Sequence, residues 1–167
     1  MTKSLSLIGK TITTTMTNRQ IPAVKAQDVA NLPKDEFAFP GPERDCLVEA
    51  ILEGRKTTTT SLMAEFIHNH EPLPAAGRRT LLLNSDDQPV AVLRYASVSV
   101  TRLGLVTPQH VLNEGEDYKS LPGWRQAHKS FWTSENMRQA LGDPDFNVDG
   151  QTLVVLETFY VEAMVVN

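Results

Sequence analysis

Apolar residues recur at two different spacings along the chain, and the spacing changes where one element gives way to the next. Residues 42–52 carry them at the three- and four-residue spacing of a helix, with Pro42 in its first turn and Gly54 just beyond its end. Residues 57–61 are four threonines and a serine, which favour an extended strand over a helix. This stretch therefore predicts a helix, a glycine stop and a strand that carries hydroxyl groups.

The remaining segments continue this mixture of helices and strands. The expected helices cover residues 63–70, 107–114, 120–132 and 134–141, and the expected strands cover residues 37–39, 79–84, 90–106 and 152–166. The segment 90–106 is too long for one flat strand, so we expect it to bend midway. Because helices do not regularly separate the strands, a doubly wound parallel sheet is disfavoured. The order predicts the α+β class, as a small, mostly antiparallel β-barrel with flanking helices.

The first 36 residues differ from the rest of the chain. They are polar and show no clean period, and Ile21-Pro22 and Leu32-Pro33 interrupt any long element. We expect residues 1–36 to form a polar extension that lies along the body or is partly disordered. Residues 37–167 are long enough to form one domain with a core of its own.

Composition and charge narrow the class of partner. Of the residues, 41% are hydrophobic and 22% charged, which is ordinary for a soluble globular protein. The net charge is -4, and residues 41–167 hold seventeen acidic against eleven basic side chains. An acidic body argues against a sequence-independent grip on a polyanion, because that needs many phosphate contacts. A small nucleoside-like ligand, or RNA bound at a local basic patch at the entrance of a cleft, is compatible with this charge.

Cysteine content and hydropathy bear on the compartment. The lone cysteine, Cys46, excludes an internal disulfide and fits a reducing compartment. No apolar run approaches the ~20 residues that a membrane span needs, and no secretory signal pattern is visible. We therefore expect a cytoplasmic protein without membrane contact. The oligomeric state is left open.

The most usable polar feature is Lys56 at the mouth of the threonine strand. Alternate strand side chains share a face, so Thr57 and Thr59 would point one way and Thr58 and Thr60 the other. If the first face borders a cleft, Lys56 brings a charge close to a row of hydroxyl groups. In the alternative, these are solvated threonines of an edge strand.

Two later segments also have two interpretations each. The run from Glu114 to Asp117 is either a solvated acidic turn or a turn that directs one carboxylate toward Lys56. Trp124 either stacks on a base or faces the core. The sequence contains no dinucleotide-binding, phosphate-loop or zinc-spaced cysteine motif, so we expect neither a cofactor nor a metal.

Four motifs, in this order, resemble one known family. They are Gly54-Arg55-Lys56-Thr57 after an Ile-Leu helix, Leu73-Pro74 with Gly77 before a Leu-rich strand, Glu114-Gly115-Glu116-Asp117, and Trp124-Arg125 with His128 and Phe131-Trp132. Over about residues 37–165 they resemble the ASCH domain of the PUA-like superfamily. The resemblance implies a PUA-like β-barrel with flanking helices and a cleft beside the segment that holds Lys56.

The resemblance also implies candidate activities. Roles linked to RNA have been proposed for the family. Some small members are amidohydrolases that remove the acetyl group of N4-acetylcytidine with a lysine, a threonine and a glutamate, and other members are reported as ribonucleases. Carried onto this chain, the catalytic residues are Lys56, Thr59 and Glu114. This chain is of the longer type, with a WRxxH segment that the short amidohydrolases lack.

Substrate binding is assigned to four further residues. Arg55 or Arg78 would reach a phosphate, Thr57 would share the hydroxyl face of Thr59, and Trp124 would stack on a base.

Two hypotheses follow from these assignments. The first is an enzyme that hydrolyses an acylated pyrimidine nucleoside, with the hydroxyl of Thr59 as nucleophile. Either Glu114 is then the base and Lys56 the oxyanion partner, or the three residues share protons as a coupled unit. The second hypothesis is a module that binds RNA or a nucleotide without chemistry. A metal-dependent ribonuclease ranks below both.

Overall fold

The computed structural model describes residues 20–118 and 120–167. Its fold is built on a mixed β-sheet. Within these residues the sheet has six strands in the order β1-β6-β5-β4-β2, and β3 pairs with β6 off this path. The strands are β1 (Ala23–Lys25), β2 (Lys34–Asp35), β3 (Thr58–Leu62), β4 (Arg79–Leu83), β5 (Pro89–Arg102) and β6 (Leu153–Val166). The helices are α1 (Ala26–Val29), α2 (Pro42–Leu52), α3 (Met63–His68), η1 (Leu103–Leu105), α4 (Pro108–Asn113), α5 (Leu121–Trp132) and α6 (Glu135–Leu141).

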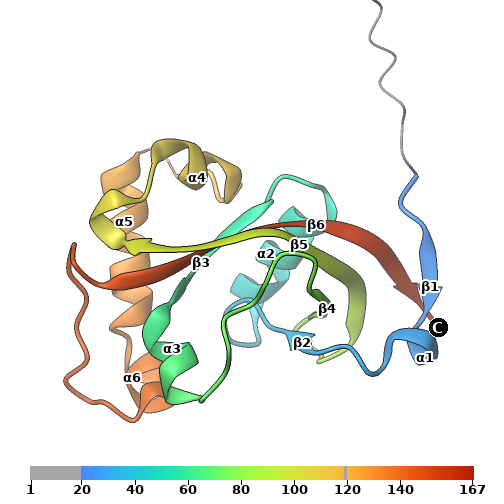
Figure 1. Cartoon of the computed structure of the whole chain (residues 1–167), viewed down its shortest axis with the longest axis horizontal. Helices are drawn as coiled ribbons and strands as arrows, with labels where there is room; N and C mark the ends of the chain where they lie inside the picture. The colour runs from blue at the N-terminus through green and yellow to red at the C-terminus, as the bar shows by residue number, and fades with distance from the viewer. Residues whose placement is uncertain (1–19, 119) are drawn as a thin grey trace, which may run out of the picture.

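The two long strands β5 and β6 run through the whole molecule and connect its two halves (Figure 1). They pair antiparallel, with shifts in register at Val92/Leu93 and Tyr95/Ser97. Such bulges bend a strand and increase its twist, and they explain how β5 can be so long. One half of β6 pairs with β3, and the other half pairs with β1.

The expected α+β class, with a mostly antiparallel PUA-like sheet and flanking helices, is confirmed. In the described part of the chain, three of the strand pairings are antiparallel, and the short strands β1 and β2 pair parallel to their neighbours. The hydrogen-bonded path over the described residues stays open, because β1 and β2 lie at its opposite ends. The sheet is therefore bent but not closed.

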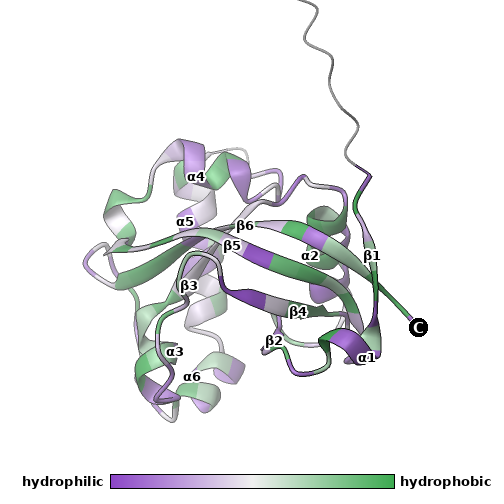
Figure 2. Cartoon of the chain, turned by 45° about the vertical axis from the view of Figure 1, so that its right-hand side comes forward, coloured by the Kyte–Doolittle hydropathy of each residue, from purple (hydrophilic) through white to green (hydrophobic). Residues whose placement is uncertain are grey.

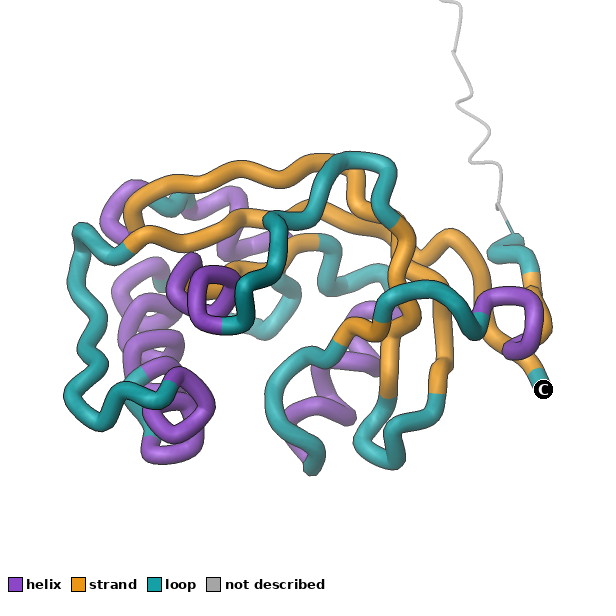
Figure 3. The backbone as a smooth tube through the Cα atoms, turned by 60° about the horizontal axis from the view of Figure 1, so that its bottom comes forward, coloured by secondary structure: helices purple, strands orange, loops and turns teal. Residues whose placement is uncertain are grey.

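Each half of the sheet has its own helices and core. At one end, α5 and α6 pack on β3 and β6 around the buried side chains of Leu62, Trp132 and Val154. At the other end, α2 packs on β5 and β6 around Ile51 and Phe159. Figure 3 shows helices α5 and α6 at the end of the molecule opposite the C-terminus. In Figure 2, hydrophobic segments along β5 and β6 are interrupted by hydrophilic ones. None of the described helices is long and apolar enough to cross a membrane.

Part of the expected N-terminal extension is built into the sheet. Residues 23–25 pair with β6, residues 34–35 pair with β4, and Val29 of α1 is buried between them. Residues 1–19 of the expected extension lie outside the described residues.

The strand expected at residues 37–39 is wrong. The chain is extended at residues 34–35 instead, and it turns at Ala38, whose φ of 60° lies in the left-handed region and ends any strand.

Candidate active site

A cleft with a volume of about 630 Å³ lies where the two halves of the sheet meet. It is bordered by β2 and the loop that precedes α2, by β3 and α3, and by α5 and β6. Its lining includes the polar side chains of Asp35, Lys56, Thr59, Ser61, Glu65, Arg78, Glu116, His128 and Glu157. The segment singled out from the sequence therefore forms one wall of a real cavity.

Lys56 is buried and held by Glu116. The turn after α2 positions it, because its backbone N–H donates to the carbonyl of Ala50 at 3.0 Å. Its side chain is 2% exposed, and Nζ lies 2.5 Å from Oε1 of Glu116. The other oxygen of Glu116 accepts a hydrogen bond of 2.8 Å from the hydroxyl of Tyr118. The ammonium group is thus fixed at the wall of the cleft.

The two faces of β3 separate the threonines as the alternation predicted. Thr58 and Thr60 are buried, whereas Thr59 and Ser61 are half-buried. Thr59 and Ser61 line the cleft, and the buried Thr60 also contributes to its lining. Thr59 is the direct antiparallel partner of Glu157 on β6. The hydroxyl of Ser61 donates to Oε2 of Glu157 at 2.9 Å. The cleft face of these two strands therefore carries two hydroxyl groups and one carboxyl group.

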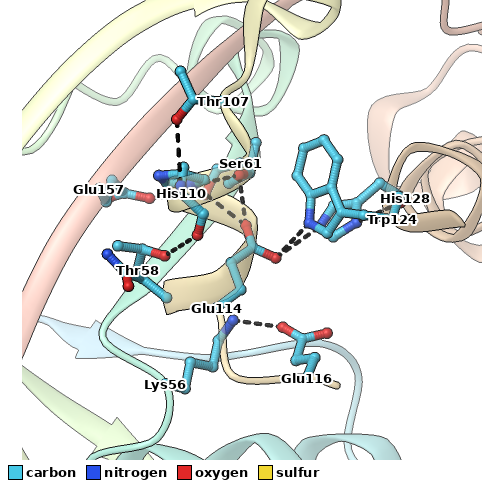
Figure 4. A network of polar contacts seen from close by, with 12 residues as sticks. Lys56, Thr58, Ser61, Thr107, His110, Glu114, Glu116, Trp124, His128 and Glu157 are labelled. Carbon is cyan, nitrogen blue, oxygen red and sulfur yellow. Dashed lines mark hydrogen bonds and ion pairs between the residues drawn. The ribbon is translucent and has the colours of Figure 1, made fainter. Parts of the chain in front are cut away.

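Glu114 lies behind this wall and is completely buried. Its Oε1 accepts a hydrogen bond of 2.7 Å from Thr60, and its Oε2 accepts one of 2.7 Å from the indole N–H of Trp124. Nε2 of His110 and Nε2 of His128 each lie 3.4 Å from one of these oxygens (Figure 4). Burial opposes the charge of this carboxylate, but the His110 hydrogen bond and the nearby Lys56 charge outweigh it and lower its pKa to about 2.

The structure therefore separates the two glutamates of the acidic turn. Glu116 forms the ion pair with Lys56, and Glu114 binds the buried side of β3 and α5. Glu114 is near enough for the Lys56 charge to affect its pKa, but the two do not form an ion pair. The two residues lie on opposite sides of Gly115, whose φ of +65° reverses the chain between them.

Glu157 was missed by the sequence analysis. Its side chain is 4% exposed, and burial raises its pKa to about 7, although the hydrogen bond from Ser61 opposes this rise. Asp35 is a second such group: burial raises its pKa against hydrogen bonds from Tyr95 and Thr80. The sequence offered one indication of Glu157. It is an acidic residue inside a strand rich in valine and leucine, where buried apolar residues are expected.

The remaining expected site residues divide between the cleft and the rest of the molecule. Arg78 lines the cleft. Arg55 is half-exposed and pairs with Glu53 at 2.6 Å, and Thr57 places its hydroxyl 3.4 Å from the carbonyl of Asn113. Trp124 is completely buried against His128, with 4.2 Å between ring centroids. The structure brings Lys56, Thr59 and Arg78 together in the cleft, and it leaves Arg55, Thr57, Glu114 and Trp124 outside its lining.

The cleft offers the parts of an acyl-transfer site. A fixed ammonium group can stabilise an oxyanion, a threonine hydroxyl can attack a carbonyl carbon, and a carboxyl group that titrates near neutrality can move protons. In the part of the chain that the structure covers, no three His, Cys, Asp or Glu residues are arranged to hold a metal ion.

One family model and several solved structures match this chain. The family model described as the ASCH domain matches residues 36–163. A crystal structure of an ASCH domain from Lactobacillus crispatus JV V101 superposes with a TM-score of 0.68 and 26% identity, covering 83% of this chain and 86% of that one. A protein from Enterococcus faecalis V583 superposes with a TM-score of 0.67 and 25% identity, covering 77% and 75% of the two chains. A comparison with curated protein sequences gives no match.

Proposed function

The chain belongs to the ASCH domain family, and on this basis we propose that its cleft binds a nucleoside-like ligand and hydrolyses an amide bond on it. The substrate class is an acylated pyrimidine nucleoside of the N4-acetylcytidine kind, as the resemblance of the Lys56 segment to the small amidohydrolases implies. The reaction breaks the C–N bond of a non-peptide amide, and the acyl carbon forms a bond to the oxygen of water.

The observation that carries the proposal is the ion pair of the buried Lys56 with the half-buried Glu116 in the cleft that Thr59 also lines. When a hydroxyl attacks an amide, negative charge develops on the carbonyl oxygen. An ammonium group that is 2% exposed interacts with this charge more strongly than one in water, and Glu116 keeps it in place before the substrate arrives. Thr59 supplies the attacking hydroxyl from the same wall of the cleft.

In this proposal Glu116 takes the place that the resemblance gave to Glu114. The carboxylate that serves Lys56 has to lie in the cleft, and Glu116 does so. Both oxygens of Glu114 are already used by donors from β3 and α5. Glu114 therefore acts as a support that holds Thr60 and Trp124 behind the site.

The charge of the cleft favours a small ligand over RNA. Among the residues that the structure describes, seven acidic and four basic side chains line it. A non-catalytic RNA-binding module would need an excess of basic groups along the path of the phosphates. The same excess of carboxyl groups disfavours a ribonuclease.

Turnover of N4-acetylcytidine, followed by absorbance, tests the proposal. We expect hydrolysis by the native protein and a loss of at least about 100-fold in kcat for Lys56→Met and for Thr59→Val. Both replacements keep the side-chain volume, and thermal unfolding will show that the fold is intact. Lys129→Met, a change at an exposed position of α5 outside the cleft lining, is the matched control and should leave kcat unchanged. A native protein without turnover would contradict the proposal.

A further inference from the structure

Glu157 is a buried carboxyl group that faces the cleft with one of its oxygens unused. Glu157 is 4% exposed, and it lines the cleft. Oε2 accepts the hydrogen bond from Ser61, whereas Oε1 has no hydrogen-bond partner among the described residues. Oε1 is not among the buried side-chain atoms that lack a partner, so it is accessible at the wall of the cleft, where a ligand can reach it. The burial of the rest of the side chain makes its charged form costly.

The strand register places this carboxyl group beside the proposed nucleophile. Thr59 and Glu157 are direct partners on β3 and β6, and side chains at directly opposed positions share a face with Cβ atoms about 5 Å apart. Both side chains line the cleft. No other carboxyl group is the strand partner of Thr59 within the described residues.

The groups around Glu157 come from four elements. Asp35 on β2 and Glu65 on α3 add negative charge, Arg78 before β4 adds positive charge, and the Tyr95 hydroxyl on β5 is bound to Asp35 at 2.5 Å. Burial is the largest influence and raises the pKa of Glu157 to about 7, with the two carboxyl groups adding to the rise. A group with this pKa is present in both protonation states at neutral pH, as proton transfer in both directions requires.

We propose that Glu157 is a catalytic residue that exchanges a proton with Thr59 and with the leaving nitrogen, a role that rests on the proposed amide hydrolysis. In this assignment Lys56 and Glu116 serve the oxyanion, and Ser61 orients the carboxyl group. The sequence placed a proton-transferring glutamate in the acidic turn, whereas the geometry places it on the last strand.

The reaction of an N-acyl substrate begins at the hydroxyl of Thr59. Oγ1 of Thr59 forms a bond to the amide carbon while its proton passes to Glu157, and the carbonyl oxygen becomes an oxyanion beside Lys56. The C–N bond then breaks, and Glu157 gives its proton to the leaving nitrogen, which departs as the amine. A water molecule attacks the ester on Thr59 and gives a proton to Glu157. The bond to Thr59 breaks as this proton returns to Oγ1, and the carboxylic acid leaves.

The experiment compares Glu157→Gln with Glu162→Gln, the same change on the same strand at a residue outside the cleft lining. We expect kcat for N4-acetylcytidine to fall by at least about 100-fold in Glu157→Gln, with KM nearly unchanged, and to stay at the native value in Glu162→Gln. For the native protein, kcat/KM should fall as the pH drops below about 7. In Ser61→Ala the pH below which kcat/KM falls should be higher, because the hydrogen bond that lowers the pKa of Glu157 is lost.

The outcomes separate this role from the proposed function. If the native protein hydrolyses the substrate and Glu157→Gln does so equally well, the role is overturned and the function stands. A pH profile that does not move in Ser61→Ala would also overturn it. If Ser61→Ala abolishes turnover while Thr59→Val does not, Ser61 and not Thr59 is the residue that exchanges a proton with Glu157, and the role is overturned. A native protein without turnover overturns the function and this role together.

Discussion

At the scale of single residues, two glutamates two positions apart have opposite surroundings. Glu116 is half-buried and pairs with Lys56 at the cleft, whereas Glu114 is completely buried among hydrogen-bond donors. A buried carboxylate is stable only while those donors are present. Glu114 should therefore matter for stability, and Glu116 for activity.

We predict that Glu114 makes stability depend on acid pH. Its pKa is about 2 in the folded protein against an ordinary 4.5, so its contribution is complete above about pH 4.5 and is lost as the pH falls toward 2. A shift of this size corresponds to about 3 kcal/mol. Glu114→Gln should lower the free energy of unfolding by an amount of that order at pH 7, and by about half of that or less at pH 3, in urea titrations.

The control for this prediction is Glu53→Gln. Glu53 is exposed and pairs with the half-exposed Arg55, so its replacement should change stability by less than about 1 kcal/mol. Equal losses at pH 7 and pH 3 for Glu114→Gln would contradict the role given to the Glu114 charge.

At the scale of elements, the site depends on the contact between two turns. The turn after α2 carries Lys56, and the turn after α4 carries Glu116. They touch at Gly115, where an added Cβ would lie 2.2 Å from the carbonyl oxygen of Arg55. Only glycine allows this approach at a φ of +65°.

Replacement of this glycine should damage both stability and the site. For Gly115→Ala we expect a loss of about 3 kcal/mol in the free energy of unfolding, because the clash with backbone adds to the strain of a positive φ. The turn must move, which separates Glu116 from Lys56 and lowers kcat. Chemical denaturation and the turnover assay measure the two effects.

Gly54→Ala is the matched control for the change at Gly115. Gly54 also has a positive φ, of +73°, but no atom of residues 20–118 or 120–167 lies within 4 Å of an added Cβ. Its replacement should cost only the conformational strain of about 1 kcal/mol and leave kcat near the native value. Similar losses in the two variants would show that close approach of the turns is unimportant.

At the scale of the whole molecule, we expect the negative charge of the protein and its cleft to affect which ligands bind. The chain carries a net charge of -4, and the cleft has more acidic than basic lining residues. Negative potential raises the free energy of a phosphate group there, while a neutral nucleoside is unaffected.

We therefore predict that cytidine binds more tightly than cytidine monophosphate. Isothermal titration calorimetry of both ligands at low salt should show an affinity at least about 10-fold lower for the phosphate, and the difference should shrink as salt screens the charges. Tighter binding of the monophosphate, weakened by salt, would instead favour a nucleotide or RNA site centred on Arg78.

The sequence by itself determined most of the elements. Helices 42–52, 121–132 and 135–141 follow from periodicity and from their Pro, Ser and Gly boundaries, since these are local properties of the chain. The ordered motifs determined the family, and the alternation of β3 determined which threonines share a face. The short strands β1 and β2 were not predictable, because two or three residues become a strand only when a neighbouring strand supplies their hydrogen bonds.

The tertiary structure alone decided the composition of the site. Thr59 and Glu157 are 98 positions apart in the chain, and only the register of β3 against β6 makes them partners. Likewise, the choice between Glu114 and Glu116 depends on how one turn packs against another around Gly115. A side chain's burial and charged neighbours come from contacts distant in sequence, so its protonation and its chemistry are properties of the fold.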